Sequence, residues 1–219
     1  TNFLGTLNML NLANKYKAKF LIASSSSIYG EAKFHPQVEE YYGEVNSYGY
    51  RSCYEEGKRV AETLCFDYQR TYKSYIRIAR IFNTYGPRMR PNDGRVISNF
   101  IDQAIRNKAL TIYGNGSQTR SFCFVDDLIK GLLMLMESDY DKPINLGNDE
   151  ELKILDLASL IKSKINPDLK FKFLPLPLND PLRRKPSIKK ALQEINWQPS
   201  IKLEEGLLRT IRYFQKNYI

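Results

Sequence analysis

The sequence is poor in the residues that build disulfide frameworks and metal centres. Its 219 residues include three cysteines, Cys53, Cys65 and Cys123, and one histidine, His35. An odd number of cysteines without paired spacing argues against a disulfide framework and against a zinc site. A single histidine disfavours a histidine-based catalytic triad and a multi-histidine metal centre. We therefore expect no metal.

Long apolar runs are also missing. The most apolar stretch, residues 128–136, is short and is interrupted by Lys130, whereas a membrane-spanning helix needs about 20 apolar residues. No signal peptide is visible in the sequence. We therefore expect no membrane span and a cytoplasmic protein.

Charge of one sign is in excess. The chain has 33 Lys and Arg against 24 Asp and Glu, a formal net charge of +9, and 42% of its residues are hydrophobic. This is a globular composition with a basic balance that suits an anionic partner, such as a phosphorylated small molecule. The chain has no Lys/Arg block with interleaved aromatic residues, so we expect no nucleic-acid partner.

The residue pattern predicts an α/β fold. Residues 18–27 form a short apolar strand, residues 48–72 contain a helix, and residues 74–83 form a β-branched strand. Strand, helix and strand in this order are the crossover unit of a parallel sheet. The expected helices elsewhere are 3–17, 96–107, 126–138, 154–165, 188–195 and 203–218, and the expected strands are 143–147 and 169–176. Residues 109–125 predict a hairpin around Asn115-Gly116.

Tyr54 and Lys58 are four residues apart in the helical segment, so the phenol and the ammonium lie on one helix face. Tyr29 and Lys33 have the same spacing. Spacing alone does not decide which pair has a chemical role. A Gly-rich turn that would cradle a dinucleotide pyrophosphate is absent from the sequence.

A set of motifs gives the sequence a family resemblance. In order and spacing the motifs are similar to those of the extended short-chain dehydrogenases/reductases, the NAD-dependent epimerase/dehydratase family, and most closely to its UDP-glucuronate decarboxylases. The motifs are GTLNMLNLA, ASSSSIYG, CYEEGKRVAET, RIARIFNTYGPRM, NDGRVISNF, LTIYGNGSQTRSF, RRKPSIKKA and INWQPS.

The resemblance implies a fold and a domain division. We expect the C-terminal part of a Rossmann-like, doubly wound parallel sheet plus a smaller α/β substrate-binding domain. Residues 1–85 would be a partial NAD-binding domain that lacks the first strands and the Gly-rich turn. Residues 86–219 would mainly bind substrate, with 121–150 returning to the NAD-binding domain.

The resemblance also assigns a cofactor and catalytic residues. It implies NAD, with Tyr54 as the base, Lys58 as its cationic partner and ribose ligand, and Ser25 as the hydroxyl that contacts the sugar oxygen. Arg184 matches an arginine of the decarboxylation step. The cofactor-binding residues implied are Ser24, Tyr54, Lys58, Thr84 and Arg90.

The substrate implied is a UDP-sugar, and the residues implied to bind it are Asn83, Arg95, Tyr113, Gln118, Arg120 and Arg184. The arginines suit this substrate because a planar guanidinium meets phosphate bidentately. The reaction implied is the decarboxylation of UDP-glucuronate to UDP-xylose through a 4-keto intermediate.

One position departs from the family pattern. Decarboxylases and 4,6-dehydratases of this family carry Glu where the chain has Ser27. A hydroxyl does not replace a carboxylate in proton transfer. The serine therefore weakens the dehydratase hypothesis and makes a UDP-sugar 4-epimerase a stronger alternative. A non-catalytic fragment without a complete cofactor site is a third hypothesis.

The resemblance further implies a homodimer. The interface would use the helices at 3–14 and 53–70. The apolar face of the second helix would serve equally well as intramolecular core, and it comprises Val60, Ala61, Leu64, Cys65 and Tyr68.

Overall fold

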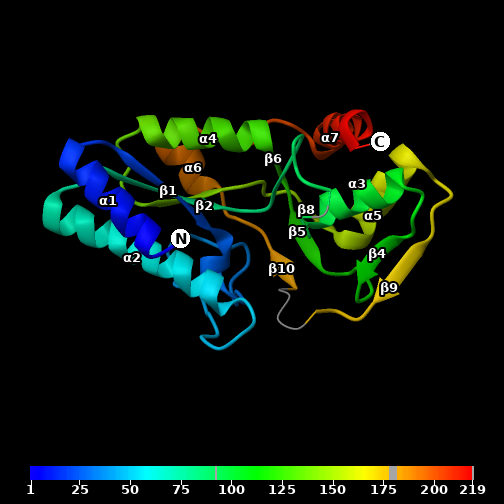
Figure 1. Ribbon diagram of the computed structural model, residues 1–219, viewed down its shortest axis with the longest axis horizontal. Helices are drawn as coiled ribbons and strands as arrows, with labels where there is room; N and C mark the ends of the chain where they lie inside the picture. The colour runs from blue at the N-terminus through cyan, green and yellow to red at the C-terminus, as the bar shows by residue number, and fades with distance from the viewer. Residues whose placement is uncertain (92, 178–181, 219) are drawn as a thin grey trace.

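The computed structural model describes residues 1–91, 93–177 and 182–218. Asn92, the first residue of the NDGR motif, lies outside the described residues. The chain forms one part around a three-stranded parallel sheet and a second part built from short strands and three helices (Figure 1). The α/β fold with a parallel sheet that the sequence predicts is confirmed.

The first sheet has the strand order β1-β2-β7, and all its pairs are parallel. Its strands are β1 (Phe20–Ser25), β2 (Ile76–Ile81) and β7 (Pro143–Leu146). Ile22 pairs with Ile78, and Ala79 pairs with Ile144. Helices cover both faces of this sheet, so its strands bury apolar side chains on both faces, and the two arginines of β2, Arg77 and Arg80, are buried as well.

Side chains of β2 alternate between the two faces of this sheet. Ile76 and Ile78 face a core with Leu10 and Cys65, from α1 (Leu4–Tyr16) and α2 (Ser52–Tyr72). Ala79 faces the opposite core, built with α4 (Val125–Glu137) and α6 (Lys189–Ile195). Figure 1 shows these two helix pairs on opposite sides of β1 and β2.

The second part packs three helices against short strands. The helices are α3 (Val96–Ile105), α5 (Ile154–Ile165) and α7 (Leu203–Tyr218). The strands form three small sheets: β3 (Thr84–Tyr85) with β6 (Cys123–Phe124), β4 (Leu110–Tyr113) with β9 (Phe171–Leu174), and β10 (Arg183–Arg184) with β5 (Thr119–Ser121) and β8 (Glu151–Lys153). Its core contains Ile101, Leu157 and Phe214, each fully buried.

The hairpin expected at 109–125 is wrong. β4 pairs in parallel with β9, and β5 pairs with β10 and β8, so the two segments do not pair with each other. Gly114 and Gly116 turn the chain with positive φ angles of 62° and 76°. After that turn, the amides of Ile154 and Leu155 donate to the Gln118 and Gly116 carbonyls. Distant segments therefore take the hydrogen bonds that a local hairpin would need.

The predicted helices and strands outside this region are confirmed, with boundaries shifted by a few residues. The helix expected at 154–165 has these limits, whereas the one expected at 96–107 ends at Ile105. The short 3-10 helix η1 (Ser26–Tyr29) and the strands β3, β8 and β10 are additional. Each has four residues or fewer, too few for an apolar period to show.

Trp197 joins the last third of the chain to the first sheet. It is 1% exposed and packs in the core of α4 and β7, and its Nε1 donates to the Asp127 carbonyl at 2.9 Å. An added Cβ on Gly131 of α4 would lie 2.8 Å from its ring. The indole thus fills the gap that this glycine leaves.

We expect Leu157→Ala to lower the free energy of unfolding by about 2–5 kcal/mol, because Leu157 is fully buried and its truncation leaves a cavity. The matched control is Leu133→Ala on α4, where the leucine is 58% exposed, with a change within about 0.5 kcal/mol. Urea unfolding of the full chain measures both. Equal losses for the two variants would contradict the core assignment.

Candidate active site

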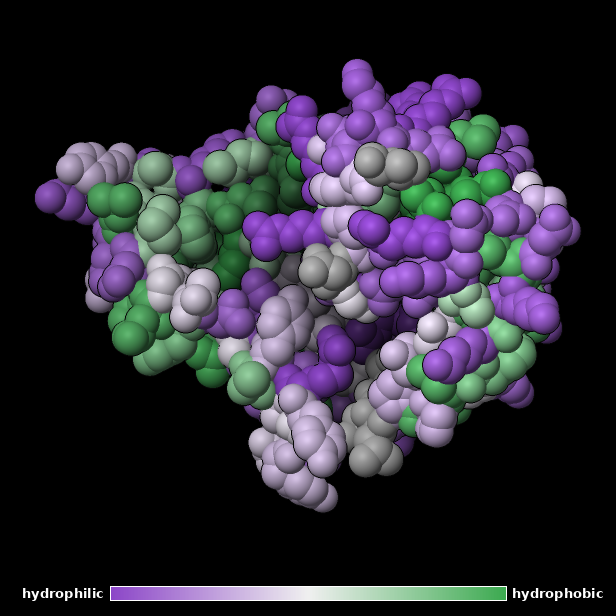
Figure 2. Space-filling view, turned by 45° about the vertical axis from the view of Figure 1, so that its right-hand side comes forward, coloured by the Kyte–Doolittle hydropathy of each residue, from purple (hydrophilic) through white to green (hydrophobic). Residues whose placement is uncertain are grey.

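A cavity of about 890 Å³ lies where the two parts of the chain meet. Ser25 at the end of β1, Asn83 just after β2, and Tyr54 in the first turns of α2 line one side. The other side comes from the second part, from α3, β4 and β5. Hydrophilic residues border this hollow in Figure 2. Its position at the carboxyl ends of parallel strands is where α/β sheets bind ligands.

Tyr54 and Lys58 both line the cavity. The Lys58 Nζ donates to the Ala23 carbonyl of β1 at 2.8 Å and lies 5.9 Å from the centre of the Tyr54 ring. Tyr54 is 41% exposed. The ammonium is thereby held beside the phenol, and the phenol is open to a ligand.

The second Tyr-Lys pair has a different environment. Tyr29 is 1% exposed, and its hydroxyl donates to the Asn145 Oδ1 at 2.8 Å. Burial raises the pKa of the Tyr29 phenol well above its usual value. Lys33 pairs with Glu44 at 3.0 Å on the surface. Tyr29 and Lys33 are therefore not a proton-transfer pair.

Three serines follow one another along the floor of the cavity. Ser25 caps η1, since its Oγ accepts from the Ser27 amide at 3.1 Å. Ser26 and Ser27 are buried and also line the cavity. Ser24 is 3% exposed, and its hydroxyl donates to Glu62 of α2 at 2.5 Å. The hydroxyl of Ser24 is therefore engaged with the helix behind the cavity.

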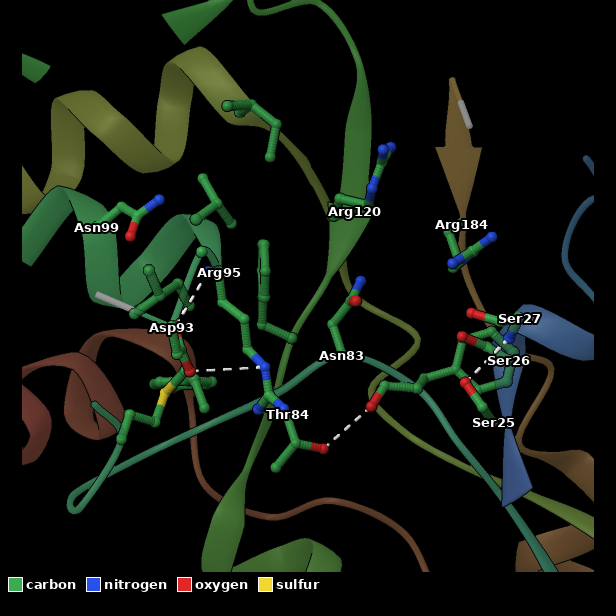
Figure 3. Close-up of a pocket in the computed structure, with 18 of the residues that line it drawn as sticks. Ser25, Ser26, Ser27, Asn83, Thr84, Asp93, Arg95, Asn99, Arg120 and Arg184 are labelled. Carbon is green, nitrogen blue, oxygen red and sulfur yellow. Dashed lines mark hydrogen bonds and ion pairs between the residues drawn. The ribbon is translucent and has the colours of Figure 1, made fainter. Parts of the chain in front are cut away.

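Asn83 and Thr84 form the wall next to these serines (Figure 3). The Asn83 carbonyl accepts from the Cys123 amide at 2.9 Å, and the Thr84 Oγ1 donates to the Phe82 carbonyl at 3.0 Å. The Asn83 Nδ2 lies 3.5 Å from the Ser121 carbonyl, a long contact. The side-chain amide of Asn83 can thus donate to a ligand oxygen with the loss of only this weak hydrogen bond.

Two arginines from distant parts of the chain meet at the cavity. Arg184 of β10 is the register partner of Arg120 in β5, and both line the cavity. The Arg184 Nη2 donates to the Gly30 carbonyl at 3.4 Å, and the Arg120 Nη1 donates to the Thr119 carbonyl at 2.8 Å. Paired strands therefore place two guanidinium groups on the same wall.

Arg95 approaches from the opposite side, at the start of α3 (Figure 3). Its Nε lies 3.6 Å from the Asp93 Oδ2, and its side chain is 67% exposed. Asp93 also accepts from the Arg95 amide at 3.0 Å and from the Ser98 hydroxyl at 2.5 Å. The carboxylate therefore fixes the loop that carries Arg95.

Tyr113 and Gln118 lie on either side of the turn after β4, where the Gln118 Nε2 donates to the Tyr113 carbonyl at 2.9 Å. Arg90 is exposed and is not among the residues that line the cavity. The structure therefore brings together eleven of the twelve residues expected from the sequence: Ser24, Ser25, Tyr54, Lys58, Asn83, Thr84, Arg95, Tyr113, Gln118, Arg120 and Arg184.

Sequence reasoning missed several polar residues of the cavity. Asn99 and Gln103 line it from α3, and Arg51 lines it from the residue that precedes α2. A signal was available for two of them, because Arg95, Asn99 and Gln103 follow one another at a spacing of four and therefore lie on one helix face.

The donor set beside β1 fits the nicotinamide end of a dinucleotide. The Tyr54 phenol, the Lys58 ammonium and the Ser25 hydroxyl all reach the cavity at the carboxyl end of the parallel sheet. The ammonium suits a ribose hydroxyl, and the two hydroxyl groups suit a carbonyl or alcohol oxygen that exchanges a proton.

The chain is similar in sequence to known enzymes over almost its whole length. UDP-glucuronic acid decarboxylase 1 of Danio rerio is 53% identical over 216 residues, which are 99% of this chain and 52% of that protein. UDP-glucuronic acid decarboxylase 6 of Arabidopsis thaliana is 55% identical over 207 residues, 94% of this chain and 60% of that protein. The chain thus spans about half the length of the curated relatives it matches.

Solved structures agree with the fold. UDP-glucose 4-epimerase of Thermotoga maritima, solved with UDP-glucose, matches with a TM-score of 0.94 at 28% identity and covers 100% of this chain and 71% of that one. UDP-glucuronic acid 4-epimerase of Bacillus cereus, in complex with UDP-glucuronic acid and NAD, gives 0.89 at 30% identity, with 99% and 68% covered.

The model of the NAD dependent epimerase/dehydratase family matches residues 1–147. The resemblance carried by the sequence motifs is confirmed, and NAD, the cofactor expected from the sequence, is the cofactor of this family. The chain belongs to the NAD dependent epimerase/dehydratase family.

Proposed function

We propose that this chain forms the substrate-binding and proton-transfer part of an NAD-dependent enzyme that decarboxylates UDP-glucuronate to UDP-xylose. The observation that carries the proposal is that Tyr54, Lys58 and Ser25 line one cavity with the buried Arg184. The identity of 52–55% to UDP-glucuronic acid decarboxylases supports the same substrate.

The proposed mechanism starts at Tyr54. Its phenolate oxygen takes the proton of the sugar C4 hydroxyl as C4 is oxidised, and Lys58 stabilises the negative charge on that oxygen. Ser25 holds the same sugar oxygen through a hydrogen bond. NAD, when bound, supplies the acceptor for the C4 hydride and later returns it.

Oxidation at C4 makes the C5 carboxylate part of a β-keto acid. The C5–carboxyl bond breaks, its electron pair passes into the C4 carbonyl, and carbon dioxide leaves. The resulting enolate takes a proton from water at C5, and reduction at C4 then returns the proton from Tyr54 to the C4 oxygen. Because the oxidation is reversed, the cofactor is not consumed.

The arginines are proposed to hold the anionic groups of the substrate. Arg120 and Arg184 come from paired strands, and Arg95 faces them from α3. Guanidinium groups meet diphosphate and carboxylate bidentately. We assign Arg184 to the carboxylate that is lost, because it is 9% exposed and lies near η1, whereas Arg95 is exposed.

A UDP-sugar 4-epimerase is the second candidate, and Ser27 is the observation that favours it. The position where decarboxylases of this family carry Glu has a buried serine in the cavity floor. Epimerisation needs a proton relay at C4 and no carboxylate that acts at C5 or C6. The Tyr54, Lys58 and Ser25 set suffices for that chemistry.

The division into two domains is part of the proposal. Residues 1–85 and the return at 121–150 would form the NAD-binding domain, since β7 completes the sheet of β1 and β2. α6 and Trp197 pack in the same core and would belong with it. The remainder of 86–219 would bind the UDP-sugar.

A cytoplasmic location also stays a prediction. In the part of the chain that the structure describes, no helix has the length and apolar character to cross a membrane. All three cysteines are free thiols, which is typical of a reducing compartment. Fractionation of cells that express the full-length protein tests this location, and recovery with the secreted fraction would contradict it.

A homodimer through α1 and α2 is the proposed assembly. On α1, Thr6, Leu10 and Ala13 face the core. A neighbouring stripe of α1, Met9, Leu12 and Tyr16, is 49–67% exposed. An exposed apolar stripe of this kind is typical of an interface.

The function is tested by proton NMR of the full-length protein with NAD and UDP-glucuronate. We expect conversion to UDP-xylose. Formation of UDP-galacturonate instead would establish the epimerase. No change in the spectrum, with NAD binding shown by calorimetry, would contradict both assignments, and no NAD binding would favour a non-catalytic chain.

We expect Tyr54→Phe to lower kcat at least about a hundredfold, because it removes the proton acceptor. The matched control is Tyr42→Phe, since Tyr42 is 88% exposed and lies outside the cavity lining. The NMR time course measures both variants. Equal rates for wild type and Tyr54→Phe would contradict the role of Tyr54.

We expect Ser27→Glu to raise the rate of UDP-xylose formation about tenfold or more, because a carboxylate restores proton transfer in the cavity floor. Ser27→Gln is the control, with similar size and no carboxylate. The measurement is the initial rate of UDP-xylose formation by NMR for both variants and for wild type. If neither variant is faster than wild type, Ser27 does not stand in for a lost catalytic carboxylate.

We expect Leu12→Arg to convert the protein from a dimer to a monomer, because it places a charge in the apolar stripe of α1. Leu133→Arg, on the exposed face of α4, should leave the dimer intact. Light scattering after size-exclusion chromatography gives both masses. A monomeric wild type would rule the dimer out.

A further inference from the structure

Behind the cavity lies a buried ion pair. Glu62 of α2 is 6% exposed and Arg80 of β2 is 8% exposed. The Arg80 Nη2 donates to the Glu62 Oε2 at 2.8 Å, and the Arg80 Nε donates to the Oε1 at 3.1 Å. Neither side chain is among those that line the cavity. The pair therefore has no direct contact with the cavity, but it can fix the position of residues that line it.

The Glu62 end of the pair holds α2 against β1. The Ser24 hydroxyl donates to the Glu62 Oε1 at 2.5 Å. One helical turn earlier, the Lys58 Nζ donates to the carbonyl of Ala23 at 2.8 Å. Two successive residues of β1 are thus bonded to two successive turns of α2, directly before Ser25 enters the cavity.

The Arg80 end of the pair holds η1, the short helix that carries Ser26 and Ser27. The Arg80 Nη1 donates to the Tyr29 hydroxyl at 3.0 Å and to the Glu39 carbonyl at 2.8 Å. The Tyr29 hydroxyl in turn donates to Asn145 of β7. The same guanidinium therefore connects the helix of Tyr54 and Lys58 to the segment that forms the cavity floor.

Stability alone is a weak reason for this arrangement. Burying two charges is costly, and replacing a buried ion pair by apolar side chains of similar size is often neutral or stabilising. Instead, the hydrogen bonds of this pair end on α2, on β1, on η1 and on the loop that follows η1. Catalysis needs the acceptor and the reacting atom aligned, and a displacement of about 1 Å can cost about a hundredfold in rate.

We propose that Glu62 and Arg80 are positioning residues, which hold the Tyr54–Lys58 face of α2 at a fixed distance and orientation from Ser25. The inference rests on the proposed function in so far as this face transfers a proton. It assigns to Glu62 and Arg80 no contact with substrate or cofactor.

The test compares the full-length wild type with Glu62→Gln and with the double variant Glu62→Met/Arg80→Met. The double variant removes both charges and keeps side chains of similar length, so it is expected to fold. Glu56→Gln is the matched control, because Glu56 is also on α2 but pairs with Arg59 at 3.7 Å on the surface. Urea unfolding of each variant accompanies the kinetics.

For both Glu62 variants we expect kcat to fall about ten- to a hundredfold, with KM for UDP-glucuronate within about threefold of wild type. The isotope effect on kcat with UDP-glucuronate deuterated at C4 should rise, because hydride transfer becomes slower than the other steps. Glu56→Gln should match wild type in all three quantities. A smaller folded fraction would lower kcat without changing the isotope effect, so an unchanged isotope effect in a double variant that unfolds like wild type would overturn the proposal.

A crystal structure of the double variant tests the positioning without any turnover. We expect the Lys58 Nζ to lose its bond to the Ala23 carbonyl. If the distance between the Lys58 Nζ and the Ala23 carbonyl oxygen stays below about 3.2 Å and the Ser24–Ser27 backbone does not move, the positioning role is contradicted. An inactive wild type would instead count against the proposed function, and the crystallographic comparison would still decide the role of the pair.

Discussion

The buried contact between Arg80 and Glu62 is the constraint on which the arrangement of the cavity depends. The two charges have left water, so each needs several hydrogen bonds to be tolerated. Glu62 obtains them from Arg80 and Ser24, and Arg80 obtains its remaining ones from Tyr29 and the Glu39 carbonyl. These requirements fix α2, β1 and η1 relative to one another. Tyr54, Lys58 and Ser25 sit on those elements, so their geometry follows from satisfying a charge pair that they do not touch.

The sheet brings together residues that are far apart in the sequence. Because β1, β2 and β7 are parallel and covered on both faces, their carboxyl ends are the open edge that can receive a ligand. Ser25 and Asn83 reach the cavity from two of these ends. The second part supplies the cationic wall, since pairing of β10 with β5 brings Arg184 beside Arg120. Under the proposed function, proton transfer and anion binding would thus be provided by separate parts of one chain.

The sequence predicted local structure and the motif residues better than it predicted distant pairing. The spacing of Tyr54 and Lys58 and the strand–helix–strand order were readable because they depend on neighbours in the chain. The expected hairpin at 109–125 failed because β4 finds β9, about 60 residues later, and a local turn signal carries no information about that partner. The contact of Arg184 with the Gly30 carbonyl likewise depends on tertiary packing.

The position of Glu62 near the candidate site could have been predicted from the sequence, because Glu62 follows Lys58 by four residues on the same helix face. Its burial could not, because a single glutamate on a helix is usually a solvated charge.

The charge balance of the cavity bears on the sugar it accepts. Ser26 and Ser27 make the floor neutral where the family pattern has a carboxylate, and Arg184 lies close enough to this segment to donate to the Gly30 carbonyl. With serine, the only carboxylate that lines the described cavity is Asp93, which is already paired with Arg95 across from the floor. Under the proposed function, the carboxylate of the sugar would therefore meet guanidinium groups in this cavity, beside a floor of serines that carries no acidic side chain.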